Sequence, residues 1–167
     1  ATICEINLTM ILINLTKAFM KGLPIQCGYF YNKKAHKKIH HLIERHQPDM
    51  LFGQMIRVAE YLRHEKTKKT IDYQDVLSMG MKRRSEIATI FTKPIFNMEY
   101  RRLKKYEHDI FDDFDIKTII SKQDRDFIDH SKRDEILIVP NGVDHEYYSP
   151  QDREKKYDIV FTGNMAY

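Results

Sequence analysis

The protein has 167 residues, with 28 Lys and Arg against 24 Asp and Glu, and therefore a net charge of +4 when histidine is neutral. A chain of this length can bury a hydrophobic core, and its 42% of hydrophobic and 31% of charged residues are ordinary for a globular domain. Six Gly and five Pro residues are too few for a disordered chain, and two cysteines exclude a disulfide-rich scaffold.

No segment has the pattern of a transmembrane helix or a signal peptide. The longest apolar stretch, residues 8–15, is interrupted by Thr9 and Asn14 and is far below the roughly 20 residues that span a bilayer. No basic segment precedes it, and no small-residue cleavage site follows it. We therefore expect a cytoplasmic protein in which Cys4 and Cys27 stay reduced.

Hydrophobic spacing predicts alternating helices and strands along the chain. We expect helices over residues 6–20, 33–46, 55–62, 76–89 and 94–111, and one more that opens with a capping box at 121–124. We expect strands over residues 25–31, 50–52, 69–73, 116–120, 136–139 and 157–161. In the helix at 94–111, Leu103, Tyr106 and Ile110 form an apolar stripe. Strands that are apolar along their length and alternate with helices predict the α/β class, with a parallel sheet covered on both faces.

A polar segment follows the strand at 136–139. We expect a turn at Asn141–Gly142, because both residues tolerate a positive φ. Domain boundaries fall in polar segments of this kind. Since the chain begins without Met and ends directly after a strand-like run, we also expect it to be a piece of a longer protein. Residues 1–144 would then form most of one domain, and residues 145–167 a linker and the first strand of another.

Polar side chains follow the predicted strands at the edge where open parallel sheets bind ligands. Asp72 and Asp75 are the clearest pair of carboxylates, and either one could accept a proton or a hydrogen bond from a substrate hydroxyl. For Asp75 we favour another interpretation, in which it caps the helix that follows. For Asp72 both interpretations stay open. Hydroxyls, amides and carboxylates at strand ends suit a polyhydroxylated ligand such as a sugar, but solvated loops are polar in any protein.

The remaining charged residues indicate solvated surface. His36 and His40 lie one helical turn apart without further ligands at metal spacing, so we expect no metal site. Two basic clusters contain Lys33, Lys34, Lys37 and Lys38, and Arg101, Arg102, Lys104 and Lys105. Such clusters can bind anionic lipid or nucleic acid, but no nucleic-acid motif accompanies them. We expect solvated helix faces with intrahelical ion pairs, since the acidic residues near the second cluster are Glu99, Glu107, Asp109, Asp112 and Asp113.

Four segments carry a resemblance to a known family. They are Asp72-Tyr73-Gln74-Asp75-Val76-Leu77-Ser78, Arg101-Arg102-Leu103-Lys104-Lys105-Tyr106-Glu107, Ile119-Ile120-Ser121-Lys122-Gln123-Asp124-Arg125, and the run from Pro140-Asn141-Gly142-Val143-Asp144 through Tyr147-Tyr148-Ser149-Pro150 to Asp158-Ile159-Val160-Phe161-Thr162-Gly163-Asn164-Met165. In this order they resemble family 4 glycosyltransferases with the GT-B fold, in particular the sugar transferases of bacterial polysaccharide clusters. The similarity spans roughly residues 20 to 167.

This resemblance implies an enzyme of two Rossmann-like domains that moves a sugar from a nucleotide-sugar donor to a saccharide or lipid-linked acceptor without a metal or other cofactor. By position, it assigns Asp72, Asp75 and Ser78 to the acceptor side of the cleft, Asn141, Gly142 and Asp144 to the hinge, and Gly163 to the donor diphosphate. The family also implies a peripheral contact with the inner face of the cell membrane.

Two parts of the family pattern are absent from the sequence. They are the first strand of the acceptor domain and the donor domain after its first strand, so we expect the fragment by itself to be inactive. The alternative function is a non-catalytic α/β module that binds an anionic polymer or a membrane surface through its basic clusters.

Overall fold

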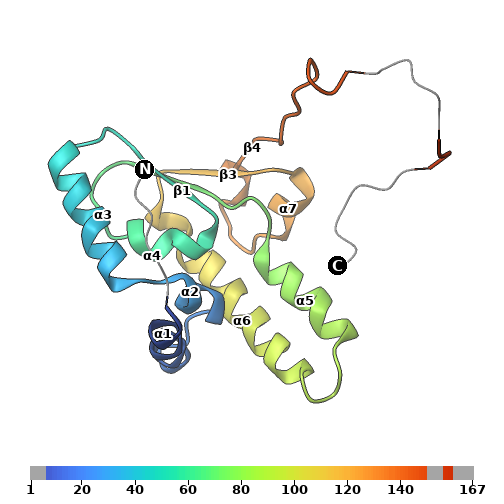
Figure 1. The fold of residues 1–167 in the computed structure, drawn as a ribbon, viewed down its shortest axis with the longest axis horizontal. Coiled ribbons are helices and arrows are strands. Elements are labelled where there is room, and N and C mark those ends of the chain that lie inside the picture. Colours follow the sequence, from blue (N-terminus) through green and yellow to red (C-terminus); the bar gives the residue numbers. More distant parts are fainter. Residues whose placement is uncertain (1–6, 150–155, 160–167) are drawn as a thin grey trace.

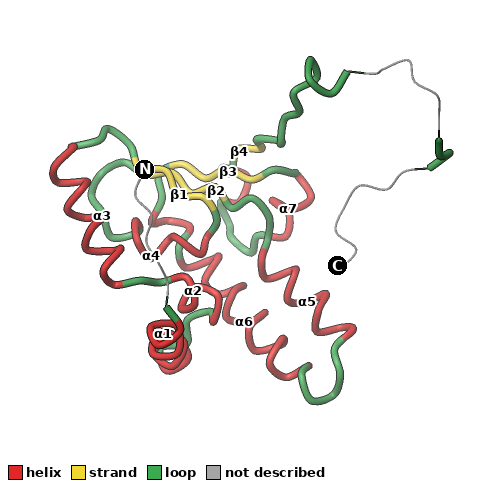
Figure 2. Tube along the Cα trace, viewed as in Figure 1, coloured by secondary structure: helices red, strands yellow, loops and turns green. Residues whose placement is uncertain are grey.

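A parallel sheet of four strands, flanked by helices, forms the centre of the protein (Figures 1 and 2). The computed structural model describes residues 7–149 and 156–159. The strands are β1 (Leu51–Gln54), β2 (Lys69–Asp72), β3 (Ile116–Ile119) and β4 (Leu137–Ile138), side by side in that order. The predicted α/β class is therefore confirmed.

Helices precede the sheet and connect its strands. Before β1 come α1 (Leu8–Met20), α2 (Ile25–Phe30) and α3 (Lys33–His46). The crossovers contain η1 (Ile56–Val58) and α4 (Ala59–Leu62), then α5 (Leu77–Ile87), α6 (Lys93–Asp109) and η2 (Phe111–Asp113), and finally α7 (Lys122–Phe127) and η3 (Arg133–Glu135). The predicted helices at 6–20, 33–46, 76–89 and 94–111 are confirmed to within a few residues. The capping box is confirmed as well, because the Asp124 N–H donates to Ser121 Oγ over 3.0 Å.

The strand order explains where the helices lie. Parallel crossovers are right-handed in nearly all proteins, so strands that follow one another in one direction put their crossover helices on one face. Figure 1 shows α4, α6 and α7 on the same side of the sheet, and Ile71 and Ile119 are fully buried beneath them. The strand register places Phe52 and Leu137 on the other face, where they are 63% and 57% exposed. Helical cover is therefore thicker on one face than on the other.

The strand predicted over residues 25–31 is wrong, because this segment forms α2. Its apolar and aromatic residues favour a strand locally, but a carboxylate from α6 caps it as a helix. Glu99 accepts hydrogen bonds from the N–H groups of Ile25 and Gln26 over 2.8 and 3.1 Å. Glu99 is 4% exposed, so these N–H groups have a buried charged acceptor at the point where the helix begins. A tertiary contact thus overrides the local preference.

The C-terminal strands also differ from the prediction. The strand expected over 136–139 shortens to Leu137–Ile138 and forms an exposed sheet edge, although the Val139 N–H still donates to the Ile119 carbonyl over 2.8 Å. The strand expected over 157–161 falls partly outside the described residues, and 157–159 form no strand. The strands predicted near β1, β2 and β3 are confirmed.

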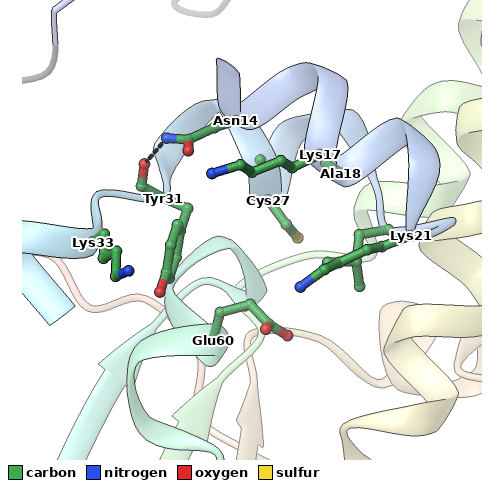
Figure 3. Close-up of a pocket in the computed structure, with 10 residues that line it drawn as sticks. Asn14, Lys17, Ala18, Lys21, Cys27, Tyr31, Lys33 and Glu60 are labelled. Atoms are coloured by element: carbon green, nitrogen blue, oxygen red, sulfur yellow. Dashed lines mark hydrogen bonds between the residues drawn. The ribbon is translucent and has the colours of Figure 1, made fainter. Parts of the chain in front are cut away.

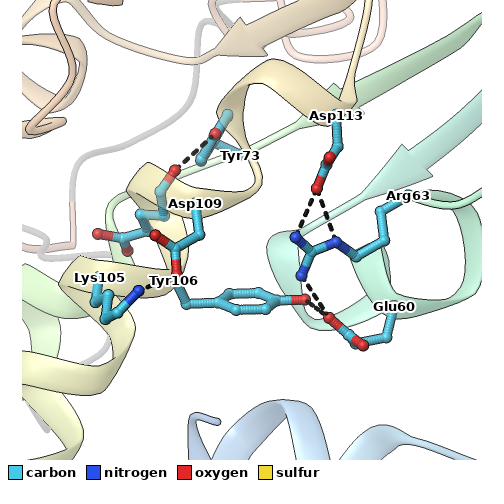
Figure 4. Close-up of polar contacts among 8 residues, drawn as sticks. Glu60, Arg63, Tyr73, Lys105, Tyr106, Asp109 and Asp113 are labelled. Atoms are coloured by element: carbon cyan, nitrogen blue, oxygen red, sulfur yellow. Dashed lines mark hydrogen bonds and ion pairs between the residues drawn. The ribbon is translucent and has the colours of Figure 1, made fainter. Parts of the chain in front are cut away.

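Helix α6 ties the crossover helices together. Its predicted stripe is confirmed, since Leu103, Tyr106 and Ile110 are all buried. The Tyr106 hydroxyl donates to Glu60 of α4 over 2.8 Å, and Arg63 bridges Glu60 and Asp113 over 3.0 and 2.7 Å (Figure 4). Because several hydrogen bonds satisfy each charge, this network fixes α6 against the β1–β2 crossover.

The crossing of α1 and α2 predicts a change in stability that can be measured. A Cβ added to Gly28 would lie 2.5 Å from the Ala18 Cβ and 3.1 Å from the Asn14 carbonyl oxygen. We expect Gly28→Ala to lower the free energy of unfolding by roughly 1–3 kcal/mol through overpacking. Urea denaturation measures the loss.

Gly80→Ala in α5 is the matched control, because nothing lies within 4 Å of its added Cβ. The same replacement in an open helix position should raise the free energy of unfolding by roughly 0.5–1 kcal/mol. Equal stability of the two variants would show that α1 does not pack on α2 at Gly28.

Candidate functional site

The candidate site is the carboxyl edge of the sheet, formed by Asp72 at the end of β2 and by residues 55–57, 73–77 and 120–124, which follow β1, β2 and β3. Because these strands are parallel, the three segments leave the sheet at the same edge. Backbone hydrogen bonds connect them directly. The Met55 N–H donates to the Asp72 carbonyl over 2.7 Å, and the Ile120 N–H donates to the Gln74 carbonyl over 3.3 Å. Side chains from three crossovers are thereby held together.

Two residues at the carboxyl edge have strained backbones. Met55 has a φ of 70° and Gln74 a φ of 63°, in the left-handed region that residues with a Cβ rarely adopt. Such a conformation costs of order 1–3 kcal/mol and persists only where surrounding contacts enforce it. Strain of this kind concentrates at ligand-binding sites, which makes this edge a stronger candidate than its polarity alone does.

Asp72 is buried at the end of β2, where its hydrogen bonds stabilise the fold. It is 9% exposed and accepts hydrogen bonds from Thr118 Oγ1 over 2.9 Å and from the Gln74 N–H over 3.3 Å. Its second oxygen accepts from the side-chain amide of Gln74. The carboxylate therefore holds Gln74 in its strained conformation and joins β2 to β3.

Asp75 differs from Asp72 because its side chain is exposed. Its interpretation as a helix cap is wrong, because α5 begins after Val76 without a side-chain cap from its own segment. The cap comes from α6, where Glu107 accepts a hydrogen bond from the Ser78 N–H over 2.9 Å. Partial burial and the nearby Asp124 carboxylate raise the pKa of Asp75 above its ordinary value, whereas Arg57 and Arg83 oppose this rise. Asp75 is thus an exposed carboxylate with a raised pKa, and within the described residues it accepts no hydrogen bond from another residue.

Ser78 and Glu107 form a buried pair beneath the carboxyl edge. Both are 2% exposed, and the Ser78 hydroxyl and N–H both bond to the Glu107 carboxylate. Burial raises the pKa of Glu107 to about 7, and the Asp75 charge adds to this effect. Ser78 also lines a cavity of about 280 Å³ between α5, α6 and α7, to which neither Asp72 nor Asp75 contributes. The structure thus places two of the three predicted acceptor residues at the edge and the third in a neighbouring cavity.

The sequence pattern misplaced Glu107 and Glu99, which we expected on a solvated face. Both are buried and accept backbone hydrogen bonds at the starts of α5 and α2. Their spacing with Leu103 on one helical stripe is the signal that could have placed them inside. Gln74 and Met55 carried no sequence signal, since their importance lies in their backbone conformation.

The predicted hinge residues lie in an exposed segment that leaves the sheet after β4 (Figure 1). The turn expected at Asn141–Gly142 is wrong, because neither residue has a positive φ and the turn lies at 145–148. Asp144 stabilises that turn by accepting hydrogen bonds from the N–H groups of Glu146 and Tyr147 over 3.1 and 3.0 Å. Gly163, the predicted contact with the donor diphosphate, lies outside the described residues.

The other candidate groups have mostly structural roles. His40 lies 3.0 Å from Glu65, His36 lies 2.9 Å from the Tyr31 hydroxyl, and the described residues contain no group of three or more side chains placed to hold a metal. Burial raises the pKa of the Cys27 thiol to about 12, so Cys27 is not a nucleophile at neutral pH.

The two basic clusters differ in their surroundings. The cluster at Lys33, Lys34, Lys37 and Lys38 is exposed on α3. In the second cluster, Lys104 pairs with Asp129 over 3.0 Å, and Arg102 donates to the carbonyls of Phe19 in α1 and of Leu23 after it. The α3 cluster therefore carries the freer positive charge.

No family model, no curated protein and no solved structure matches this chain. Within the described ranges, no helix is both long and apolar enough to cross a membrane. The chemistry of the carboxyl edge therefore has to be judged from its own residues. It offers one exposed carboxylate, Asp75, beside hydroxyl and amide groups that can hydrogen-bond to a polyhydroxylated ligand.

The buried Glu107 predicts a pH dependence of stability. Its pKa in the folded protein, about 7, exceeds its ordinary value of 4.5, so its contribution to stability is present at low pH and is lost as the pH rises towards 7. Glu107→Gln keeps an oxygen that can accept from the Ser78 N–H and removes the charge. We expect the variant to gain stability over the wild type by on the order of 2 kcal/mol between about pH 5 and about pH 8.

Urea denaturation over this pH range measures the gain, and Glu86→Gln on the exposed face of α5 makes the same change in charge as a control. A constant difference between Glu107→Gln and the wild type at all pH values would contradict a raised pKa for Glu107.

Proposed function

We propose that this chain is part of a family 4 glycosyltransferase, in which the carboxyl edge of the sheet binds the acceptor of a sugar-transfer reaction. The motif order from Asp72 to Met165 supports the family, and the parallel sheet flanked by helices is the kind of domain that the family implies. The reaction moves a glycosyl group from a nucleotide-sugar to a saccharide or lipid-linked hydroxyl. A second domain of the complete protein would bind the nucleotide.

The exposed Asp75 carboxylate is the observation that carries this proposal. It lies directly after the strained Gln74, and its pKa is raised by burial and the Asp124 charge against the opposing charges of Arg57 and Arg83. A carboxylate with a raised pKa at the open edge of a parallel sheet is suited to accept a hydrogen bond, or a proton, from an attacking hydroxyl. Asp72 would have a positioning role, because it holds Gln74 and the edge in place. Ser78 would also have a positioning role, through its hydrogen bond to Glu107.

The hinge residues, the donor site and the membrane contact belong to the same proposal. Asp144 begins a defined turn in the exposed segment after β4, which is a suitable place for a connection between domains. The exposed lysines on α3 would favour a peripheral contact with an anionic membrane that carries a lipid-linked acceptor.

Nucleotide release by the complete protein tests the proposal. The protein is incubated with a panel of nucleotide-sugars and acceptors, and the released nucleotide is quantified. We expect Asp75→Asn to reduce kcat by roughly 10²-fold or more, because the amide cannot accept a proton from the acceptor hydroxyl. Asp49→Asn is the matched control, since Asp49 is exposed at the opposite, amino edge of the sheet, and we expect it to leave kcat unchanged.

Two results would overturn the proposal. One is the absence of nucleotide release with every nucleotide-sugar of the panel. The other is an equal effect of Asp75→Asn and Asp49→Asn, which would remove the carboxyl edge from the reaction.

A further inference from the structure

A second candidate site lies away from the carboxyl edge, in a cavity of about 260 Å³ bounded by α1, α2, the start of α3 and α4. Figure 3 shows Lys17 of α1, Lys21 directly after α1 and Lys33 of α3 directing their ammonium groups into this cavity, with Glu60 on its floor. None of its lining residues belongs to the carboxyl edge, so a ligand here would be distinct from the proposed acceptor.

The charge of the cavity is positive and largely uncompensated. Within the described part of the chain, none of the three lysines forms an ion pair, because no carboxylate lies within 4.0 Å of their ammonium groups. Glu60 is occupied elsewhere, since it accepts from Arg63 over 3.0 Å and from the Tyr106 hydroxyl over 2.8 Å (Figure 4). Because Arg63 already compensates Glu60, the three ammonium groups leave an excess of positive charge in the cavity, which a bound dianion would reduce.

Hydrogen bonds and a ring contact fix the walls of the cavity. The side-chain amide of Asn14 donates to the Tyr31 carbonyl over 2.6 Å, and the Tyr31 ring stacks on Tyr61 with 5.5 Å between ring centroids. Arg102 of α6 donates to the Phe19 carbonyl over 3.2 Å, at the end of α1. The positions of Lys17 in α1 and of Lys21 directly after it are therefore set before any ligand binds, which lowers the cost of binding.

The other lining groups add a hydroxyl and an apolar wall. Burial, followed by the Glu60 charge, raises the pKa of the Tyr31 hydroxyl, which lies 2.9 Å from His36 Nδ1. Ala18, Leu23 and Gly28 line the remaining surface without charge. An anionic group among the lysines, attached to a short apolar stem, would match this division of the cavity.

We propose that the cavity between α1, α2 and α4 binds a phosphate monoester, with Lys17, Lys21 and Lys33 as the cationic ligands. Lysine ammonium groups bind phosphate as mobile point charges, and a doubly charged phosphate would offset most of the positive charge of the three lysines. A soluble phosphate ester and the phosphate headgroup of a lipid share this chemistry.

Exposed apolar side chains on α1 favour a lipid headgroup as the source of the phosphate group. Leu8, Leu12, Phe19 and Met20 are 72%, 59%, 55% and 81% exposed on the same helix that carries Lys17 and is followed directly by Lys21. A helix with apolar residues outside and lysines beside them is suited to the surface of a bilayer.

Binding of inorganic phosphate to the 167-residue chain, measured by calorimetry, tests the site itself. We expect the variant Lys17→Gln, Lys21→Gln to weaken phosphate binding by at least about tenfold, because two of the three cationic ligands are lost. The variant Lys66→Gln, Lys68→Gln removes the same charge from exposed positions before β2 that do not line the cavity. We expect this control to change the affinity by less than about twofold, and circular dichroism confirms that both variants are folded.

Sedimentation with vesicles distinguishes the two sources of phosphate. Binding to phosphatidylcholine vesicles that contain phosphatidic acid, but not to pure phosphatidylcholine, with a loss in Lys17→Gln, Lys21→Gln, would assign the lipid headgroup. Phosphate binding without vesicle binding would assign a soluble ester. Absence of both, or an equal loss in the two double variants, would overturn the site. None of these measurements requires sugar transfer, so they fail or succeed independently of the proposed function.

Discussion

Two buried carboxylates on one stripe of α6 organise the helical side of this protein. Glu99 accepts from the first N–H groups of α2, and Glu107 accepts from an N–H group in the first turn of α5. A buried charge is costly unless hydrogen bonds satisfy it, and the unpaired N–H groups at a helix start are equally costly to bury. Each glutamate and each helix start therefore satisfies the other. The position of α6 fixes where α2 and α5 begin, and α2 in turn supports α1.

This arrangement explains which parts of the fold the sequence could predict. The strands β1, β2 and β3 and the helices α1, α3, α5 and α6 follow from local hydrophobic spacing, which needs no partner elsewhere in the chain. Helix α2 does not follow from local spacing, because the carboxylate that caps it belongs to Glu99, more than 70 residues away in the sequence. Among lysines and arginines, Glu99 and Glu107 have the pattern of partners in surface ion pairs. Their spacing with Leu103 is the one sequence signal against that interpretation, and the packing of α6 against two helix starts shows that they are buried.

The location of the candidate site could be predicted from the sequence, but the roles of its residues could not. Parallel strands bring their carboxyl ends to one edge, so Asp72 and Asp75 could be located from the strand pattern. Their roles depend on neighbours that the pattern does not contain. Asp72 is occupied by Thr118 and Gln74, whereas Asp75 is released from capping because Glu107 already caps α5. The exposed carboxylate at the edge is thus a consequence of the buried one beneath it.

The segment from Met55 to Arg63 connects the two candidate sites physically. The N–H of the strained Met55 donates to the backbone of β2. Arg57 opposes the rise in the pKa of Asp75 and donates to the side chain of Gln26 in α2. Glu60 lies on the floor of the lysine cavity. A substitution in this segment would disturb both sites together with the bridge of Arg63 to Glu60 and Asp113. Asp75, Lys17 and Lys21 lie outside it and make no side-chain contact on which the described fold depends. Their substitution therefore reports on one site at a time, whereas any change at Glu60 would combine altered charge in the cavity with a broken contact to α6.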